Sequence, residues 1–315
     1  MRALVVAERS YMLEATIRAL YDDGHSVGKI WCQYKPRRMF RKSMLRFITN
    51  LPRCPATLIH KHAIPVRQIE QSQMRNLDAI CDEDGPFDIL ISAGTHIIFR
   101  KAFLDRFDGN AFNMHPALLP RYGGPRPRFS MIFDGTLDQF SGLSLHKLIP
   151  KIDAGAIIAQ RHIPRSPYRN VMAWDLAIAD GAYAMLRNEL KAHLGGALEA
   201  IPQDPALASY HSLSAEETFI TSRLTFEKLA SFMKQAYGIY GFTFAKVPVD
   251  KNATRDIAVC GIPARLGACT RQPARITHGS VEMDFADARV RLSRETKWVR
   301  ALKRIDRYRT ILLGK

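Results

Sequence analysis

Several features that define other protein classes are missing from the 315-residue sequence. The five cysteines are scattered and form no CxxC pair, which argues against a zinc site or a disulfide framework. No apolar run approaches a membrane span, and the N-terminal run is too short for a secretory signal. The turn after the first predicted strand, AERSYM, has no glycine, so we reject an NAD-dependent dehydrogenase. We expect a cytoplasmic protein with no membrane partner and no bound metal.

Acidic residues are absent between His25 and Ile69, although the chain as a whole has 30 Asp and Glu. The 46 Lys and Arg give a net charge of +16, and many lie in KPRRMFRKSMLRFITNLPR at 35–53. Basic residues recur at helical spacing near the end of the chain: Lys297, Arg300, Arg304 and Arg307. Such patches attract the phosphates of nucleic acids, nucleotides or lipid head groups. A solvated basic surface without a partner is the alternative.

Buried-looking strands alternate with helical segments over the first 195 residues. Strands are predicted at 2–7, 27–32, 87–92, 111–115, 143–149 and 156–163, and helices at 10–22, 101–107, 127–134 and 170–194. This alternation favours a mainly parallel sheet covered by helices on both faces. Glycine and proline are frequent at 195–208, where we place a linker.

The pattern changes after this segment. A helix is predicted at 225–237, with Phe226, Leu229, Phe232 and Met233 on one face. Short alternating runs follow, such as FTFAKVPV and SVEMDFA, separated by turn residues. They favour a small antiparallel barrel or sandwich. We therefore predict an α/β domain at 1–205 and a smaller β-rich domain at 206–315.

The sequence FNMHPALLPRYGG at 112–124 places polar residues at the end of a predicted buried strand. Asn113 and His115 are two positions apart, so their side chains point to the same side of an extended chain. Pro116 and Pro120 end the strand and restrict the loop that follows. In open α/β sheets ligands bind at the carboxyl ends of strands, and we expect a site here.

A second polar cluster lies downstream, with His146 inside a predicted strand and Asp153 at the next turn. A histidine with a carboxylate and an amide nearby suits acyl transfer. The imidazole can move a proton, the amide can stabilise an oxyanion, and the carboxylate can orient the imidazole. From the residues alone, an alternative stays open: Asp153 caps a turn, His115 is a satisfied buried histidine, and Asn113 serves a loop.

Two longer patterns carry a family resemblance. N-x-H-P-x-LLP-x-Y-x-G begins at Asn113, and G-x-S-x-H-x-x-x-x-x-I-D-x-G-x-I-I begins about 30 residues later. Over roughly 87–165 the chain resembles the folate-dependent formyltransferase family. That resemblance implies a Rossmann-like domain that moves a formyl group from 10-formyltetrahydrofolate to a primary amine. It also implies that Asn113 polarises the formyl oxygen, His115 is the general acid and base, and Asp153 positions His115.

The resemblance further implies contacts for both substrates. The predicted folate contacts are Ala93, Gly94, His96, Ile97, Ile98, Phe99, Leu148, Ile149 and Ile152. The predicted contacts of the amine substrate are Lys35, Arg37, Arg38, Arg41, Lys42, Arg121, Gly123, Gly124 and His146. Ala117 stands where the family usually has Ser, and we expect activity to survive this change with altered support of the loop.

The sequence leaves two candidate acceptors of the formyl group. The chain resembles methionyl-tRNA formyltransferases in its size, in its C-terminal β-rich domain, which we expect to be OB-like, and in its basic segment 35–53. The favoured acceptor is therefore the amino group of Met on initiator tRNA. His146 and the loop at 121–127 resemble the sugar N-formyltransferases, so a nucleotide amino sugar is the alternative. A non-enzymatic RNA-binding module explains the basic patches but leaves Asn113, His115 and Asp153 without a role.

Overall fold

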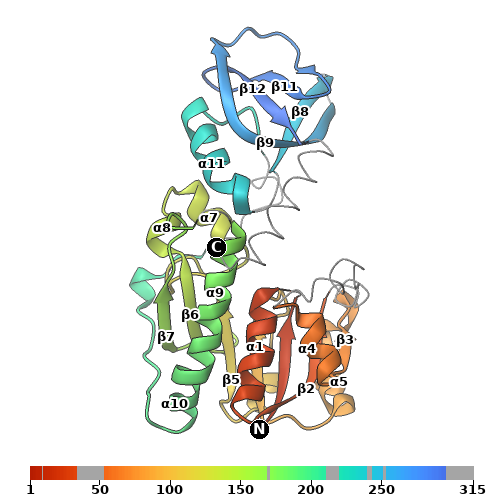
Figure 1. Cartoon of the computed structure of the whole chain (residues 1–315), viewed down its shortest axis with the longest axis vertical. Coiled ribbons are helices and arrows are strands. Elements are labelled where there is room, and N and C mark those ends of the chain that lie inside the picture. The colour runs from red at the N-terminus through yellow and green to blue at the C-terminus, as the bar shows by residue number, and fades with distance from the viewer. Residues whose placement is uncertain are drawn as a thin grey trace. The chain divides into compact units, whose positions relative to one another are not determined.

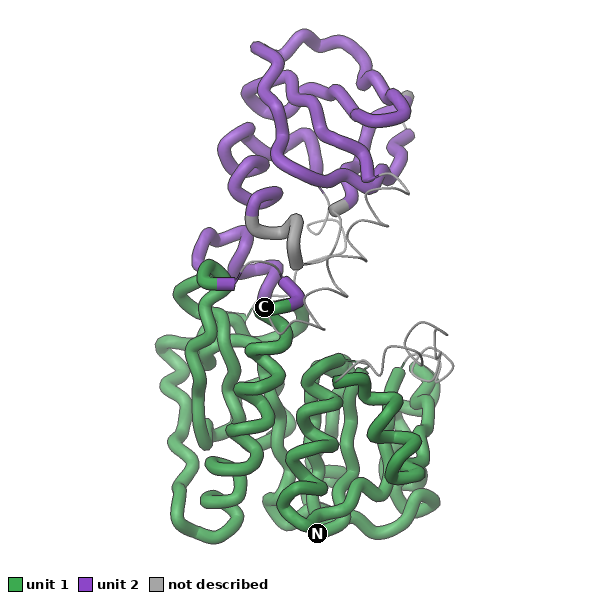
Figure 2. Tube along the Cα trace, in the orientation of Figure 1, with its two compact units in different colours: residues 1–127, 138–167, 173–211 green, residues 128–137, 168–172, 212–315 purple. Residues whose placement is uncertain are grey.

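The structure is a computed structural model of the whole chain (Figure 1). It describes residues 1–8, 10–33, 53–168, 171–210, 220–239, 243–250 and 253–295. Contacts between residues divide the chain into two compact units (Figure 2). Unit 1 comprises residues 1–127, 138–167 and 173–211, and unit 2 comprises residues 128–137, 168–172 and 212–315.

Unit 1 begins with a strand–helix–strand segment. Strand β1 (Arg2–Ala7) is completely buried from Ala3 to Ala7, as a parallel strand covered on both faces must be. Helix α1 (Tyr11–Asp22) follows, and Ser10 caps it because its Oγ accepts a hydrogen bond from Leu13 N at 3.1 Å. Strand β2 (Ser26–Cys32) then runs parallel to β1. The predicted elements at 2–7, 10–22 and 27–32 are thus confirmed.

Seven strands form the sheet of unit 1, in the order β3-β2-β1-β4-β5-β6-β7. The others are β3 (Val66–Gln68), β4 (Ile89–Ala93), β5 (Ala111–His115), β6 (Gly142–Lys147) and β7 (Ile157–His162). Strands β1 to β5 pair in parallel, whereas β6 pairs antiparallel with both β5 and β7. The mainly parallel sheet is confirmed. The β6–β7 pair is antiparallel because only a turn joins the two strands.

Helices cover this sheet. Beside α1, they are α4 (Pro55–Lys61), α5 (Leu77–Asp84), α6 (Lys101–Asp105), α8 (Leu137–Phe140), α9 (Val171–Met185) and α10 (Lys191–Leu194). Short turns of other helix types are η1 (Gln71–Arg75), η2 (Leu186–Leu190) and η3 (Pro205–Leu207). Figure 1 shows α1, α4 and α9 in front of the sheet. A hydrophobic cluster joins Leu4, Val6 and Trp31 to Ile80 of α5 and Phe103 of α6.

The segment at 195–208 is not the linker that its glycines and prolines predicted. It lies along unit 1, which extends to residue 211. Ile201 exchanges two backbone hydrogen bonds with Ile157 of β7, each 2.8 Å long. Backbone pairing with a sheet edge therefore fixes residues whose composition resembles a free connection. The predicted domain boundary at 205–206 stays a prediction.

The described part of unit 2 contains an antiparallel sheet, most of helix α7 (Pro127–Phe133) and helix α11 (Phe226–Ile239). Its strands are β8 (Thr243–Asp250), β9 (Ala253–Gly267), β10 (Arg275–Ile276), β11 (Ser280–Asp284) and β12 (Arg289–Arg294), in the order β10-β11-β12-β9-β8. Leu229, Phe232 and Met233 of α11 are buried, as their spacing predicted, whereas Phe226 is only half-buried. The β-rich character is confirmed, whereas an OB-like topology stays a prediction.

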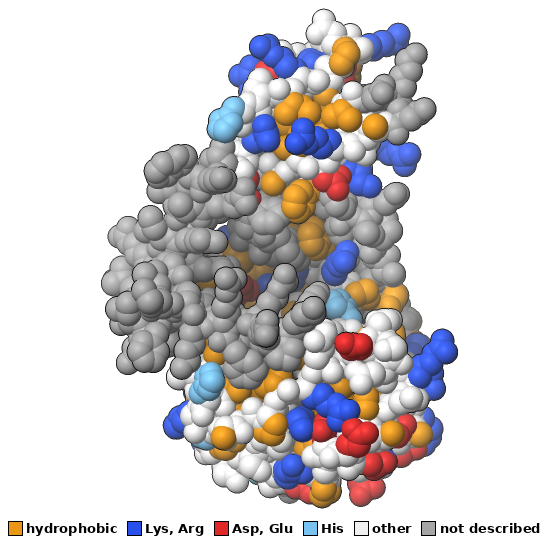
Figure 3. Space-filling model, turned by 90° about the vertical axis from the view of Figure 1, so that its right-hand side faces the viewer, with side chains coloured by type: hydrophobic (Ala, Val, Ile, Leu, Met, Phe, Trp, Pro, Cys, Tyr) orange, Lys and Arg blue, Asp and Glu red, His pale blue; other side chains and the backbone are white. Residues whose placement is uncertain are grey.

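The surface of unit 2 carries basic side chains. Figure 3 shows Lys and Arg side chains beside apolar ones on the face that it draws. Strand β12 contributes Arg289, Arg291 and Arg294, of which Arg289 is buried and bonded to Asp284 and Thr270. Within the described residues, no helix is long and apolar enough to cross a bilayer.

Candidate active site

Two polar side chains lie at the carboxyl end of β5. Asn113 and His115 occupy alternate positions of this strand and therefore point to the same side. The antiparallel register of β5 with β6 sets His146 directly opposite Asn113. Asn113 Nδ2 lies 3.1 Å from His146 Nε2. The sheet thus brings together three residues that are up to 33 positions apart in the sequence.

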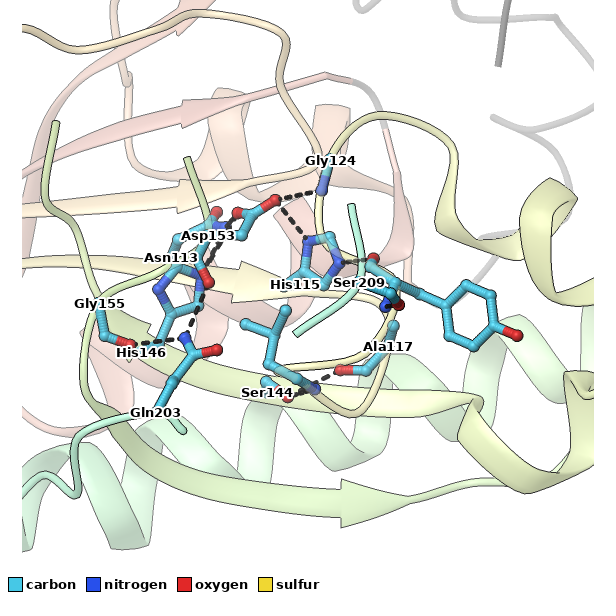
Figure 4. Close-up of polar contacts among 12 residues, drawn as sticks. Asn113, His115, Ala117, Gly124, Ser144, His146, Asp153, Gly155, Gln203 and Ser209 are labelled. Atoms are coloured by element: carbon cyan, nitrogen blue, oxygen red, sulfur yellow. Dashed lines mark hydrogen bonds and ion pairs between the residues drawn. The ribbon is translucent and has the colours of Figure 1, made fainter. Parts of the chain in front are cut away.

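Asp153 reaches the same place from the turn between β6 and β7. Its backbone has φ 51°, in the left-handed region that a non-glycine residue seldom adopts. One carboxylate oxygen, Oδ2, lies 3.5 Å from His115 Nδ1 and accepts a hydrogen bond from Gly124 N at 2.8 Å. The other, Oδ1, accepts from Asn113 Nδ2 at 3.3 Å (Figure 4). The three predicted catalytic residues therefore meet at one point.

Neighbouring carbonyl oxygens set the tautomers of the two imidazoles. His115 Nε2 lies 2.8 Å from the backbone oxygen of Tyr122, so Nε2 carries the hydrogen. In the neutral ring, Nδ1 then presents its lone pair on the side of Asp153. His146 Nδ1 lies 2.9 Å from the oxygen of Lys147, which leaves His146 Nε2 as an acceptor. Asn113 Nδ2 can donate to that nitrogen.

Burial and nearby charges set the protonation states of His115 and Asp153. Burial of the ring lowers the pKa of His115 below 6.5, although the Asp153 carboxylate acts to raise it. Burial acts to raise the pKa of Asp153, but the adjacent His146 ring, His115 and the Gly124 N–H lower this pKa to about 2. At neutral pH the site therefore holds a neutral imidazole beside an anion, an arrangement that can accept one proton. No group of three or more His, Cys, Asp or Glu is placed to hold a metal ion among the described residues.

A buried hydroxyl supports the loop that leaves β5. Ser144 Oγ donates to the backbone oxygen of Ala117 at 2.7 Å and accepts from Leu119 N at 3.0 Å. Gln160 Nε2 donates to the oxygen of Leu119 at 2.7 Å. Side chains of β6 and β7 thus form hydrogen bonds with the backbone of this loop. One of these bonds is at Ala117, the position where the family usually has Ser.

The predicted folate segment runs from Ala93, the last residue of β4, to Phe99. Gly94 has φ +67°, which lets the chain turn directly after the strand. Ile97 and Phe99 are buried in the core cluster, where Phe99 stacks on Phe103. Ile98 is 58% exposed. A ligand at this segment would therefore meet Ile98 and backbone groups, while Ile97 and Phe99 fix the loop from behind.

The second predicted folate segment shows the same division. Leu148 packs against the core cluster, whereas Ile149 and Ile152 are each 41% exposed. Ile152 directly precedes Asp153. Exposed apolar side chains thus adjoin the polar group, as a site for an aromatic ring beside a reacting centre requires.

The predicted contacts of the amine substrate divide into two sets. Gly123 and Gly124 are buried at the site, where a Cβ on Gly123 would lie 3.6 Å from Asp153 Cβ. Arg121 in the same loop is exposed. The basic residues before β3 lie outside the described residues, and their role stays a prediction: Lys35, Arg37, Arg38, Arg41 and Lys42.

Sequence reasoning missed Gln203 and Ser209. Gln203 Nε2 donates to the backbone oxygens of Asp153 and Gly155, both at 2.7 Å. Ser209 Oγ accepts from Tyr122 N at 2.9 Å. Both residues lie in or next to the segment predicted as a linker, and a polar side chain in such a segment carries no periodic signal that points to a partner.

Gly155 is required by a close approach of two backbone segments. A Cβ at this position would fall 1.8 Å from the backbone oxygen of Lys147. We expect Gly155→Ala to displace the turn that carries Asp153 and to lower the free energy of unfolding by about 3 kcal/mol, the upper range for overpacking. Urea unfolding measures this change. Gly195→Ala is the control, because its Cβ meets nothing closer than 3.4 Å; equal losses in the two variants would contradict the account.

Comparison with known proteins assigns the chain to a family. A family model described as formyl transferase matches residues 5–182, more than half of the chain. The chain belongs to the formyl transferase family. The matched region contains the end of β1, all of β2 to β7 and every residue of the predicted catalytic group.

Individual members of the family resemble the chain to different extents. A methionyl-tRNA formyltransferase of Halalkalibacterium halodurans is 27% identical over 195 residues, which cover 62% of this chain and 58% of that protein. The chain thus spans about half the length of the curated relatives it matches.

Solved structures show the same fold at low identity. A 4-N formyltransferase from Francisella tularensis superposes with a TM-score of 0.58 at 14% identity, over 83% of this chain and 97% of that one. An N-formyltransferase from Helicobacter canadensis, solved with folinic acid and dTDP-3-aminofucose, superposes with a TM-score of 0.54 at 14% identity, over 94% of this chain and 99% of that one.

Proposed function

We propose that this chain transfers the formyl group of 10-formyltetrahydrofolate to a primary amine. The convergence of Asn113, His115 and Asp153 at the carboxyl end of β5 carries this proposal. The site holds a neutral base, an anion beside it and an amide donor, and these are the groups that transfer of an acyl group between two nitrogens requires.

The residues have distinct roles in the proposed reaction. The amine nitrogen attacks the formyl carbon, and Asn113 Nδ2 donates to the oxygen that becomes negative. His115 Nδ1 takes the proton that the amine loses, and Asp153 stabilises the resulting imidazolium. The C–N bond to the folate N10 then breaks, and His115 returns the proton to N10. Tetrahydrofolate and the formylated amine leave with atoms and charge balanced.

Asn113 must change partners to fill this role. Both hydrogens of its Nδ2 are engaged, one by His146 Nε2 at 3.1 Å and the other by Asp153 Oδ1 at 3.3 Å. The bond to Asp153 is the longer one and is the one exchanged when a formyl oxygen arrives. Asp153 keeps its bond from Gly124 N during this exchange, so the carboxylate stays in place.

The folate is proposed to bind beside this group. Ile98, Ile149 and Ile152 are exposed and apolar, and can cover the faces of a pterin ring. The Helicobacter canadensis neighbour, solved with folinic acid, supports a folate as the formyl donor. Backbone groups at Ala93 to Phe99 lie at the end of β4, next to β5 in the sheet.

Methionyl-tRNA is the acceptor that we place first. The curated relatives with this activity support it. The basic segment 35–53 supplies charges that can bind a phosphate backbone without reading its sequence.

A nucleotide amino sugar is the second candidate. Two structural neighbours that each span 94% of the chain support it: one is described as a sugar 3N-formyl transferase, and the other was solved with dTDP-3-aminofucose. The contact of His146 with Asn113 favours it further, because the resemblance links a histidine at this position to the sugar branch. Its diphosphate would also bind to basic residues.

Separate assays distinguish the two acceptors. Tetrahydrofolate release is followed with methionyl-tRNA and with nucleotide amino sugars, each alone, for the wild type and for a variant with charges reversed at Arg37, Arg38, Arg41 and Lys42. If tRNA is the acceptor, turnover occurs with tRNA, falls steeply with salt and is lost in the variant. Turnover with a sugar alone, unaffected by the charge reversal, would contradict the first candidate and support the second.

A further inference from the structure

Residues 201–210 touch the backbone on both sides of the His115–Asp153 pair. The segment starts at Ile201, which pairs with Ile157 of β7, and ends at Tyr210, which forms a backbone bridge with Gly123. It lies beyond residues 5–182, which the family model matches.

Gln203 holds the turn that carries Asp153. Its Nε2 has two hydrogens, and these go to the backbone oxygens of Asp153 and Gly155, each at 2.7 Å. Both hydrogens are therefore used within one turn (Figure 4). The backbone of Asp153 is in the left-handed region, a conformation that persists only when its surroundings fix it. Gln203 supplies such a constraint from outside the turn.

Ser209 holds the loop on the other side. Its N donates to Pro120 O at 3.0 Å, its O accepts from Gly123 N at 2.9 Å, and its Oγ accepts from Tyr122 N at 2.9 Å. The same loop supplies the Tyr122 oxygen that bonds to His115. It also supplies Gly124 N, which donates to Asp153.

These contacts hold the two loops that set the distance between the His115 imidazole and the Asp153 carboxylate. His115 Nδ1 and Asp153 Oδ2 are 3.5 Å apart, and both side chains are almost completely buried. The attraction between an imidazolium and a carboxylate falls inversely with their separation and is strong where water is excluded. The only other titratable side chain beside His115 among the described residues is His146 on β6.

We propose that Gln203 and Ser209 are positioning residues that set the His115–Asp153 geometry through the backbone of the two loops. This inference rests on the proposed formyl transfer. Neither residue touches the reacting atoms. Their loss leaves the base and the anion present but free to separate, which in comparable cases costs about 100-fold in rate for a displacement of 1 Å.

Gln203→Leu tests the inference, because leucine is similar in size and donates no hydrogen bond. Amide hydrogen exchange, followed by NMR, reports on Gly124 N, whose partner is the Asp153 carboxylate. We expect exchange at Gly124 to become at least 10-fold faster while the amides of β1 and β4 stay protected. We also expect kcat to fall about 10- to 100-fold with KM for the folate within twofold. Unchanged Gly124 exchange and kcat would overturn the inference.

Asp204→Ala is the matched control. Asp204 belongs to the same segment and its Oδ1 accepts from Ala206 N at 2.9 Å, but among the described residues its side chain forms no hydrogen bond or ion pair with either loop of the site. We expect wild-type exchange at Gly124 and wild-type kcat. A loss equal to that of Gln203→Leu would mean that the whole segment acts as a structural unit, and would overturn the specific role of Gln203.

Ser209→Ala decides the matter if Gln203→Leu does not fold. It removes only the bond to Tyr122 N and leaves the two backbone bonds of residue 209. Selective loss of protection at Gly124 supports the inference, and wild-type exchange contradicts it. The exchange measurement needs no turnover. Failure of the wild type to formylate any amine would therefore count against the proposed function alone.

Discussion

His115→Gln lowers the rate of formyl transfer by about two to four orders of magnitude, the range that general acid–base catalysis contributes. Glutamine is close to histidine in size, and its amide can keep the hydrogen bond that Tyr122 O now accepts from Nε2. It has no nitrogen that accepts a proton near neutral pH. Single-turnover rates with saturating folate measure the loss, and folate affinity is expected to stay within a few-fold.

The control is a second His→Gln change in the same sheet, which shows whether losing any imidazole there lowers the rate. His162 lies on β7, is exposed, and donates through Nε2 to Asp138 O at 2.6 Å, away from the catalytic group. We expect His162→Gln to keep the wild-type rate. A His115→Gln variant that also keeps a rate within tenfold of the wild type would remove the general base from the account.

Asp153→Asn has the second largest expected effect, about a 100-fold lower rate at neutral pH, at the lower end of the acid–base range. The amide keeps the shape of the carboxyl group but cannot stabilise an imidazolium as an anion does. It also removes the carboxylate that acts to raise the pKa of His115, so this pKa falls further below its usual value. The pH–rate profile measures both changes.

The direction of the pH effect follows from the base. His115 must be neutral to act, so the rate rises with pH through the pKa of His115, which lies below 6.5, and is level above it. In Asp153→Asn this acid limb moves to lower pH and the plateau falls. Asp105→Asn on α6, where Lys101 is the partner of the carboxylate, is the control and should leave both unchanged. An acid limb that moves to higher pH, or an unchanged plateau, would contradict the role of Asp153.

Local sequence patterns predicted the elements that position the site. Patterns of apolar residues predicted β1, α1 and β2, because local geometry determines these elements, but they did not predict α4, β3 or α5. The two-residue spacing of Asn113 and His115 placed both on one side of β5. The family motif supplied Asp153, whose approach to His115 depends on a turn 38 positions away and has no local signal.

Contacts that depend on three-dimensional packing were not predictable in this way. Gln203 lies in a segment whose glycines and prolines indicated a linker, and Ser209 directly follows that segment, yet hydrogen bonds to two loops fix both residues to unit 1. The division of the folate segment into buried Ile97 and exposed Ile98 likewise depends on which side of the loop faces the core. The two isoleucines are equally hydrophobic, so hydrophobicity alone cannot tell which of them is buried.

Transfer of a labelled formyl carbon tests the central claim most directly. The wild type is mixed with 10-formyltetrahydrofolate that carries carbon-13 in the formyl group, and with methionyl-tRNA or a nucleotide amino sugar. The account predicts that the label appears as an N-formyl group on one of these amines, with one tetrahydrofolate released for each label transferred. Binding of the folate without label on either amine, or release of the label only as formate, would contradict it.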